Sequence, residues 1–151
     1  MPRTDTAART IAATPHAIYQ ALIDPELVVQ WLPPAGMTGH IDAFEPHPGG
    51  LYRMTLTYDD HTIAGKSGNS SDVVEGRFVA LADDQRVVQQ FDFASDDPAF
   101  AGTMTMVWSL AAVPGGTEVT ICCDNVPDGI AKQDHIEGMG ASLANLAALL
   151  E

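Results

Sequence analysis

The sequence predicts an α+β fold in which a curved antiparallel sheet carries a long C-terminal helix. In the last segment, 128–151, apolar side chains recur at spacings of three and four, as on one buried helix face: Ile136, Met139, Leu143, Leu146 and Leu150. Most of the chain before it alternates apolar and polar residues, which is typical of half-buried strands. Short turns between successive strands favour antiparallel neighbours.

The first predicted elements are a strand at 7–13 and two short helices. Thr14-Pro15 predicts a helix start, because threonine is a good N-cap and proline suits the first helical position. Asp24-Pro25-Glu26 repeats this signal. The second helix is expected to end near Trp31, since prolines follow and a proline disfavours helix in the residue before it.

Six further strands are predicted before the final helix. Alternation places them at 38–45, 51–58, 72–82, 86–93, 102–112 and 117–124. Pro46-His47-Pro48-Gly49-Gly50 is a hairpin signal between the first two of these strands. The polar segment 59–71 is the one long predicted loop and a candidate lid over a cavity mouth.

Composition limits the classes of partner. A chain of 151 residues is expected to form a single domain, 1–151. Twenty acidic residues against seven basic ones give a net charge of −13, which argues against nucleic acid and anionic membranes as partners. The chain shows neither a secretory signal nor an apolar run near the ~18 residues that span a membrane. We therefore expect a soluble cytoplasmic protein without membrane insertion, either monomer or homodimer.

The two cysteines, Cys122 and Cys123, are adjacent on a predicted strand. Neighbouring strand residues point to opposite faces, so a disulfide between them would be strained. We expect two buried or half-buried thiols.

Strand alternation also sorts side chains into an inward and an outward set. Tyr52, Met54, Leu56 and Tyr58 share one face, and so do Met104, Met106, Trp108 and Leu110, and both sets are expected to face the helix.

Three polar residues fall on the same inward phase. His40 and Asp42 share the face of Phe44, and Gln89 shares that of Phe91. An unpaired buried polar group costs about 1–3 kcal/mol. These groups either satisfy one another at the sheet rim or point into a hollow that holds a small molecule.

Gly138 and Gly140 lie inside the predicted final helix. Each costs about 1 kcal/mol there relative to alanine. We interpret them as a close approach of the helix backbone to a neighbour, with the sheet favoured and a bound ligand as the alternative.

Short motifs follow one another along nearly the whole chain. They are Thr14-Pro15, Ile18-Tyr19, Ala21-Leu22, Asp24-Pro25-Glu26 and Trp31, then Asp42-x-Phe44, Pro48-Gly49-Gly50-x-Tyr52, Gly76-x-Phe78, Arg86-Val87-Val88, Met104-x-Met106-x-Trp108, Gly116-Thr117-x-Val119-Thr120, His135-x-x-Gly138 and Leu143-x-x-Leu146. In this order they resemble the SRPBCC (START-like) superfamily, and within it the branch named for the activator of heat-shock-protein-90 ATPase.

The resemblance implies a helix-grip (START/Bet v-like) fold with an internal pocket for apolar ligands. One departure concerns Met139, where the family often has tryptophan. Methionine is smaller and more adaptable, and it is expected to enlarge or soften the cavity. Fold alone does not fix function, because members of the superfamily range from lipid binders to cyclases.

The first functional hypothesis is a carrier that holds a small apolar or aromatic ligand between sheet and helix. The candidate ligand-binding residues are Trp31, His40, Asp42, Tyr52, Met54, Tyr58, Gln89, Phe91, Met106, Trp108, Met139 and Leu143. The alternative from another class is a partner protein of a chaperone, as the name of the branch suggests. Such a partner is expected to expose an apolar patch, whereas a carrier hides its apolar surface.

A third hypothesis is a cyclase or hydrolase that uses His40 and Asp42. A carboxylate beside an imidazole fixes its tautomer and raises its basicity, so the pair is a weak candidate for a general base. Gln89 or Tyr58 is then the candidate oxyanion donor. Established catalytic motifs are missing from the sequence, and the five histidines lack metal-ligand spacing, so we expect neither a metal nor a cofactor.

Overall fold

The computed structural model describes residues 3–33, 36–58, 71–93 and 102–151. Its strands form a seven-stranded antiparallel sheet in the order β1-β7-β6-β5-β4-β3-β2. They are β1 (Arg3–Ile11), β2 (Met37–Phe44), β3 (Leu51–Tyr58), β4 (Ser71–Ala82), β5 (Arg86–Phe93), β6 (Gly102–Val113) and β7 (Gly116–Val126). The helices are α1 (Pro15–Ile23), α2 (Pro25–Trp31) and α3 (Lys132–Leu150).

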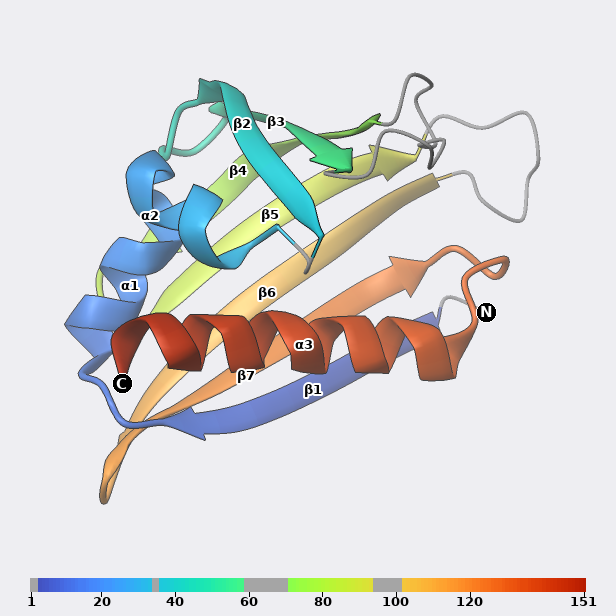
Figure 1. The fold of residues 1–151 in the computed structure, drawn as a ribbon. Coiled ribbons are helices and arrows are strands. Elements are labelled where there is room, and N and C mark those ends of the chain that lie inside the picture. Colours follow the sequence, from blue (N-terminus) through green and yellow to red (C-terminus); the bar gives the residue numbers. More distant parts are fainter. Residues whose placement is uncertain (1–2, 34–35, 59–70, 94–101) are drawn as a thin grey trace.

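The predicted architecture is confirmed: the sheet curves around a long C-terminal helix, and two short helices follow the first strand (Figure 1). Of the predicted lid, 59–71, residues 59–70 lie outside the described residues, and the last residue, Ser71, begins β4.

Both short helices begin at the predicted caps. The Thr14 hydroxyl accepts a hydrogen bond from the Ala17 amide at 3.1 Å, and the Asp24 carboxylate accepts one from the Glu26 amide at 2.9 Å. These contacts satisfy amides that the first helical turn leaves without partners. The Trp31 indole donates to the Ala21 carbonyl at 2.8 Å, which ties the end of α2 back to α1.

The two terminal elements differ from their predicted limits. β1 begins at Arg3 instead of residue 7. The prediction missed these first residues because the buried side chain among them is the carboxylate of Asp5, which hydrophobic alternation cannot detect. α3 begins at Lys132 instead of 128, after a turn in which the Ile130 amide donates to the Pro127 carbonyl at 3.0 Å.

α3 covers only part of the sheet. It packs mainly against β1, and against α1 and α2 at its C-terminal end, while β2–β5 curl away from it (Figure 1). Helix and sheet are therefore in close contact at one side and apart at the other.

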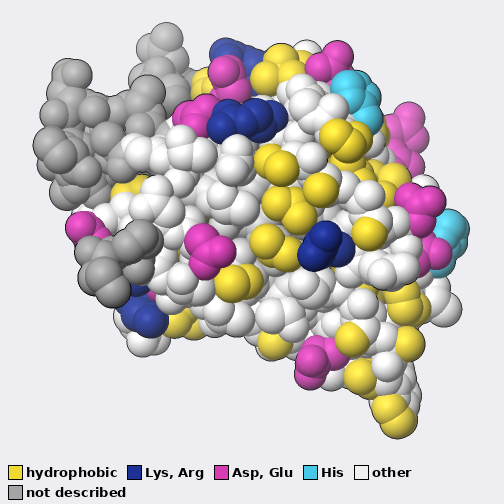
Figure 2. Space-filling view, turned by 180° about the vertical axis from the view of Figure 1, so that it is seen from behind, with side chains coloured by type: hydrophobic (Ala, Val, Ile, Leu, Met, Phe, Trp, Pro, Cys, Tyr) yellow, Lys and Arg dark blue, Asp and Glu magenta, His cyan; other side chains and the backbone are white. Residues whose placement is uncertain are grey.

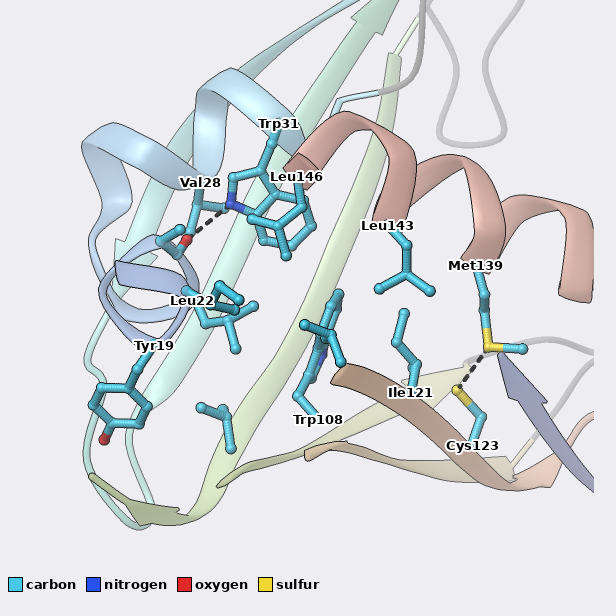
Figure 3. Close-up of a cluster of buried hydrophobic side chains, with 14 of the residues drawn as sticks. Tyr19, Leu22, Val28, Trp31, Trp108, Ile121, Cys123, Met139, Leu143 and Leu146 are labelled. Atoms are coloured by element: carbon cyan, nitrogen blue, oxygen red, sulfur yellow. Dashed lines mark hydrogen bonds between the residues drawn. The ribbon is translucent and has the colours of Figure 1, made fainter. Parts of the chain in front are cut away.

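A buried cluster joins α3 to the sheet (Figure 3). Trp31 and Trp108 meet edge to face with ring centroids 5.5 Å apart. Burial, with smaller contributions from nearby charges, raises the pKa of the Cys123 thiol to about 12, and this thiol lies 3.7 Å from the sulfur of Met139. Cys122 and Cys123 are both free, as predicted.

An aromatic cluster fills the inner face of the opposite half of the sheet. Tyr52 contacts Phe44, Phe78 and Phe91 at centroid distances between 5.4 and 5.9 Å. Gly76 lies opposite both Tyr52 and Phe91 in the sheet register, so their rings meet across the glycine. A glycine flanked by aromatic side chains is thereby shielded without a side chain of its own.

Replacing Gly76 by alanine is expected to destabilise the protein by about 1–3 kcal/mol, the usual cost of overpacking. The added Cβ would overlap the Gln90 carbonyl oxygen and lie 2.6 Å from Cδ1 of Phe91. Urea unfolding of Gly76→Ala measures the change, and an unaltered midpoint would contradict the packing described above.

Replacing Gly140 by alanine is expected to stabilise the protein by about 0.5–1 kcal/mol. Gly140 is exposed within α3, and a Cβ there meets nothing within 4 Å, so only the helix propensity changes. The same unfolding assay tests this variant, and a loss of stability would show that the position is constrained.

Candidate functional site

A cavity of about 1400 Å³ lies between the sheet and α3. Described residues from α2, from β3 to β7 and from the N-terminal half of α3 line it, and its surface is mostly apolar. It forms where β3–β5 curl away from the helix. The cavity end that faces α1 and α2 is closed by Leu22, Val28 and Trp31.

Seven of the predicted ligand-binding residues line this cavity. They are Trp31, Tyr52, Gln89, Phe91, Met106, Trp108 and Met139. Met54 and Leu143 are buried in the core without lining it, and Tyr58 is half-buried and also absent from its wall. Met104, Ile121, Ile130 and Ser142 line the cavity as well, although they were not among the candidate site residues.

The predicted inward orientation of His40 and Asp42 is wrong. A β-bulge between Ile41 and Ala43 inserts Asp42 as an extra residue, so Phe44 faces inward while His40 lies opposite Thr55 on the outer face. The His40 side chain is 78% exposed, and Asp42 accepts from the Thr55 hydroxyl at 2.6 Å. Neither residue lines the cavity, so the pair cannot act on a molecule held there.

Two buried polar side chains in the cavity wall have free hydrogen-bonding capacity. Gln89 is 6% exposed and Tyr52 is 4% exposed, and no described residue makes a hydrogen bond to the amide of one or the hydroxyl of the other. Burial raises the pKa of Tyr52, so its hydroxyl stays protonated and able to donate. An amide and a hydroxyl in an apolar wall are the kind of groups that orient a bound small molecule.

Apart from Met139, the wall contributed by α3 is made of small and polar residues. His135, Gly138 and Ser142 recur at helical spacing along the cavity, and a Cβ on Gly138 would meet nothing within 4 Å. The prediction that the helix glycines mark close approach to the sheet is therefore wrong. Gly138 faces open cavity space, and Gly140 is exposed outside the cavity wall.

A buried ionic cluster lies at the α3 side of the cavity, and the sequence analysis did not identify it. The Asp5 side chain is 0% exposed and is held by Arg3 through two hydrogen bonds of 3.0 and 3.1 Å. Nδ1 of His135 lies 2.7 Å from the same carboxylate, and Nζ of Lys132 lies 4.0 Å away. Hydrophobic periodicity interprets a polar residue at an inward strand position, such as Asp5, as the end of the strand. The sequence also contains no pattern that would pair Asp5 with His135, which lies 130 residues away.

The carboxyl of Asp5 is ionised despite its burial. Desolvation raises its pKa, but the hydrogen bonds from His135 and Arg3 and the charges on these groups lower it, and the net result is a pKa below the ordinary 3.8. A buried anion with three cationic or hydrogen-bonding neighbours fastens the start of α3 to β1.

Within the described ranges, no three His, Cys, Asp or Glu side chains come close enough together to hold a metal ion. None of the helices described is both long and apolar enough to cross a membrane.

Replacing Asp5 by asparagine is expected to reduce the free energy of unfolding at neutral pH by about 2 kcal/mol, since hydrogen bonds to a charged group are lost. The folded pKa of Asp5 is lowered, so its contribution is fully present above the unfolded value of 3.8 and is lost as pH falls through the folded pKa. Urea unfolding over a pH series measures the gap between wild type and variant, which should shrink below about pH 4.

Asp84→Asn provides the matched control. Asp84 pairs with His16 at 3.0 Å on the surface, with side chains 44% and 68% exposed. Its loss should change stability by less than about 0.5 kcal/mol. Equal effects of the two substitutions would contradict a special role for the buried carboxylate.

Solved structures share this fold. A protein from Chromobacterium violaceum is 27% identical with a TM-score of 0.82, and the match covers 98% of this chain and 96% of that one. A protein from Rhodobacter sphaeroides is 23% identical over 99% and 97% of the two chains, with a TM-score of 0.79. An AHSA1-like protein from Aeromonas hydrophila is 17% identical over 97% and 90%, with a TM-score of 0.74.

These matches confirm the helix-grip fold that the resemblance implied. No curated protein sequence matches the chain with significance. The model of the family "Activator of Hsp90 ATPase homolog 1-like protein" matches residues 12–151. The chain therefore belongs to the family of activator of Hsp90 ATPase homolog 1-like proteins.

Proposed function

We propose that this protein binds a small apolar or aromatic molecule in the cavity between its sheet and α3. The observation that carries the proposal is the combination of a large apolar cavity with two polar groups in its wall, on Gln89 and Tyr52, to which no described residue makes a hydrogen bond. Among the described residues, no fully buried side-chain nitrogen or oxygen lacks a partner, so the amide and the hydroxyl are accessible from the cavity and can bond to a polar substituent of a ligand.

The cavity is large enough for the proposed ligand. Its volume of about 1400 Å³ exceeds the range of roughly 300–1,000 Å³ typical of small-molecule sites. Trp31, Trp108, Tyr52 and Phe91 line it. Such a wall suits a flat apolar ligand, because aromatic rings pack edge to face or offset.

The partner-protein alternative finds less support. Among the described residues, the exposed large hydrophobic side chains are Leu51, Val73 and Val79, each about two fifths exposed. They belong to β3 and β4, and the ion pairs Arg53–Glu75 and Arg77–Asp92 link β3 to β4 and β4 to β5. The view from behind shows apolar side chains interspersed with charged ones (Figure 2). A partner-binding surface usually presents a contiguous apolar patch.

The catalytic alternative with His40 and Asp42 is not supported either. Both side chains belong to the outer face, where Arg53 and Thr55 are the neighbours of Asp42. Gln89 and Tyr58, the candidate oxyanion donors, occupy inward positions across the sheet from this pair.

Replacing Gly138 by leucine is expected to weaken binding of the neutral aromatic probe N-phenyl-1-naphthylamine by about tenfold or more, equivalent to about 1.4 kcal/mol. The new side chain would occupy cavity space that Gly138 leaves open. Binding is measured by quenching of tryptophan fluorescence, since both tryptophans of the chain line the cavity.

Gly140→Leu is the matched control, because it makes the same change two residues further along the helix, on an exposed face outside the cavity. It should leave probe affinity unchanged. Failure of the wild type to bind the probe, or equal affinities of both variants, would contradict ligand binding in this cavity.

A further inference from the structure

The pair formed by Asp5 and His135 differs from the other His–Asp pairs of the described chain. His16–Asp84 and His40–Asp42 lie on the surface, with histidine side chains 68% and 78% exposed. The His135 side chain is 16% exposed, its Asp5 partner is fully buried, and His135 lines the cavity. This pair is therefore the one placed to meet a bound molecule.

The contact with Asp5 fixes the tautomer of His135. An ionised carboxylate only accepts hydrogen bonds, so Nδ1 of His135, 2.7 Å from Oδ2 of Asp5, carries the proton. In the neutral imidazole, Nε2 then presents a lone pair. No described residue makes a second hydrogen bond to this ring, so Nε2 is left as an acceptor for a donor outside the protein.

The surrounding charges favour a neutral donor over an anion. Arg3 and Lys132 neutralise the Asp5 carboxylate. The charged side chains that line the cavity are four carboxylates, Glu45, Glu75, Asp92 and Asp134, against one arginine, Arg77. The whole chain carries a net charge of −13. A carboxylate ligand would meet this negative field, whereas a hydroxyl group would not.

From this geometry we propose that the ligand is an aromatic compound with an acidic hydroxyl of the phenol class, and that His135 accepts the hydrogen bond from that hydroxyl. Asp5 acts as a positioning residue, because it holds the imidazole in the tautomer with a free Nε2. The apolar body of the ligand lies against Trp108 and Phe91, and Gln89 offers a second polar contact. This inference rests on the proposed ligand-binding function.

The test compares 2-naphthol with 2-methoxynaphthalene by isothermal titration calorimetry at neutral pH. The two probes share one ring system, and in 2-methoxynaphthalene a methyl group replaces the hydroxyl hydrogen of 2-naphthol. Wild type should bind 2-naphthol about fivefold to tenfold more tightly, the range that one net hydrogen bond supplies. The ratio of the two affinities within one variant cancels any general loss of binding caused by altered folding.

In His135→Phe the ratio should fall to about one, because both ring nitrogens are removed. Asp5→Asn should lower it part of the way, since the tautomer is no longer fixed. His16→Phe, on the surface pair, should keep the ratio of the wild type. Nitrogen-15 NMR of the imidazole adds a direct readout: 2-naphthol should shift Nε2 of His135 and leave Nδ1 protonated.

The outcomes separate this inference from the proposed function. Binding of both probes with equal affinity in the wild type would overturn the role of His135 and leave the cavity as a ligand site. Tighter binding of 2-naphthoate than of 2-naphthol would overturn the choice of a neutral hydroxyl. Binding of none of the three probes would overturn both proposals.

Discussion

The packing of α3 against one side of the sheet is the constraint on which the rest of the structure depends. Met139, Leu143 and Leu146 are buried against the sheet and the short helices, and the helix follows β1 along its length (Figures 1 and 3). A helix is too narrow to cover seven twisted strands. Once it is fixed over β1 and β7, the inner face of β3–β5 lacks a helical cover, and the cavity is the consequence.

The Asp5 cluster fixes the other end of the same helix, and it does so with charge instead of apolar contact. A buried ion pair is weak evidence for stability, because desolvation offsets much of the attraction. The advantage of the cluster is that hydrogen bonds are directional. Hydrogen bonds to the one carboxylate fix the orientation of the Arg3 side chain and of the His135 imidazole, whereas apolar contacts alone would let both side chains rotate. The cluster places a defined polar group beside a cavity whose wall is otherwise mostly apolar.

The features that depend on neighbouring residues in the chain were predicted correctly from the sequence. The features that depend on strand pairing or on contacts between distant residues were not. The caps Thr14 and Asp24 were confirmed, since a cap is read from neighbouring residues. His40 and Asp42 were assigned to the wrong face, because the single extra residue of a bulge reverses the phase of a strand without leaving a pattern in the sequence. Asp5 was missed because only its partners on α3 and at Arg3 make a buried carboxylate tolerable.

Met139 shows how the core and the cavity share one side chain. It is 5% exposed, its sulfur lies 3.7 Å from that of Cys123, and it also lines the cavity. Tryptophan, the residue from which Met139 departs in the family resemblance, is larger and would extend further from the same helix position. Methionine fills less space and changes shape through three rotatable bonds. The side chain that anchors α3 to β7 is thus also the part of the cavity wall best able to adapt to the outline of a ligand.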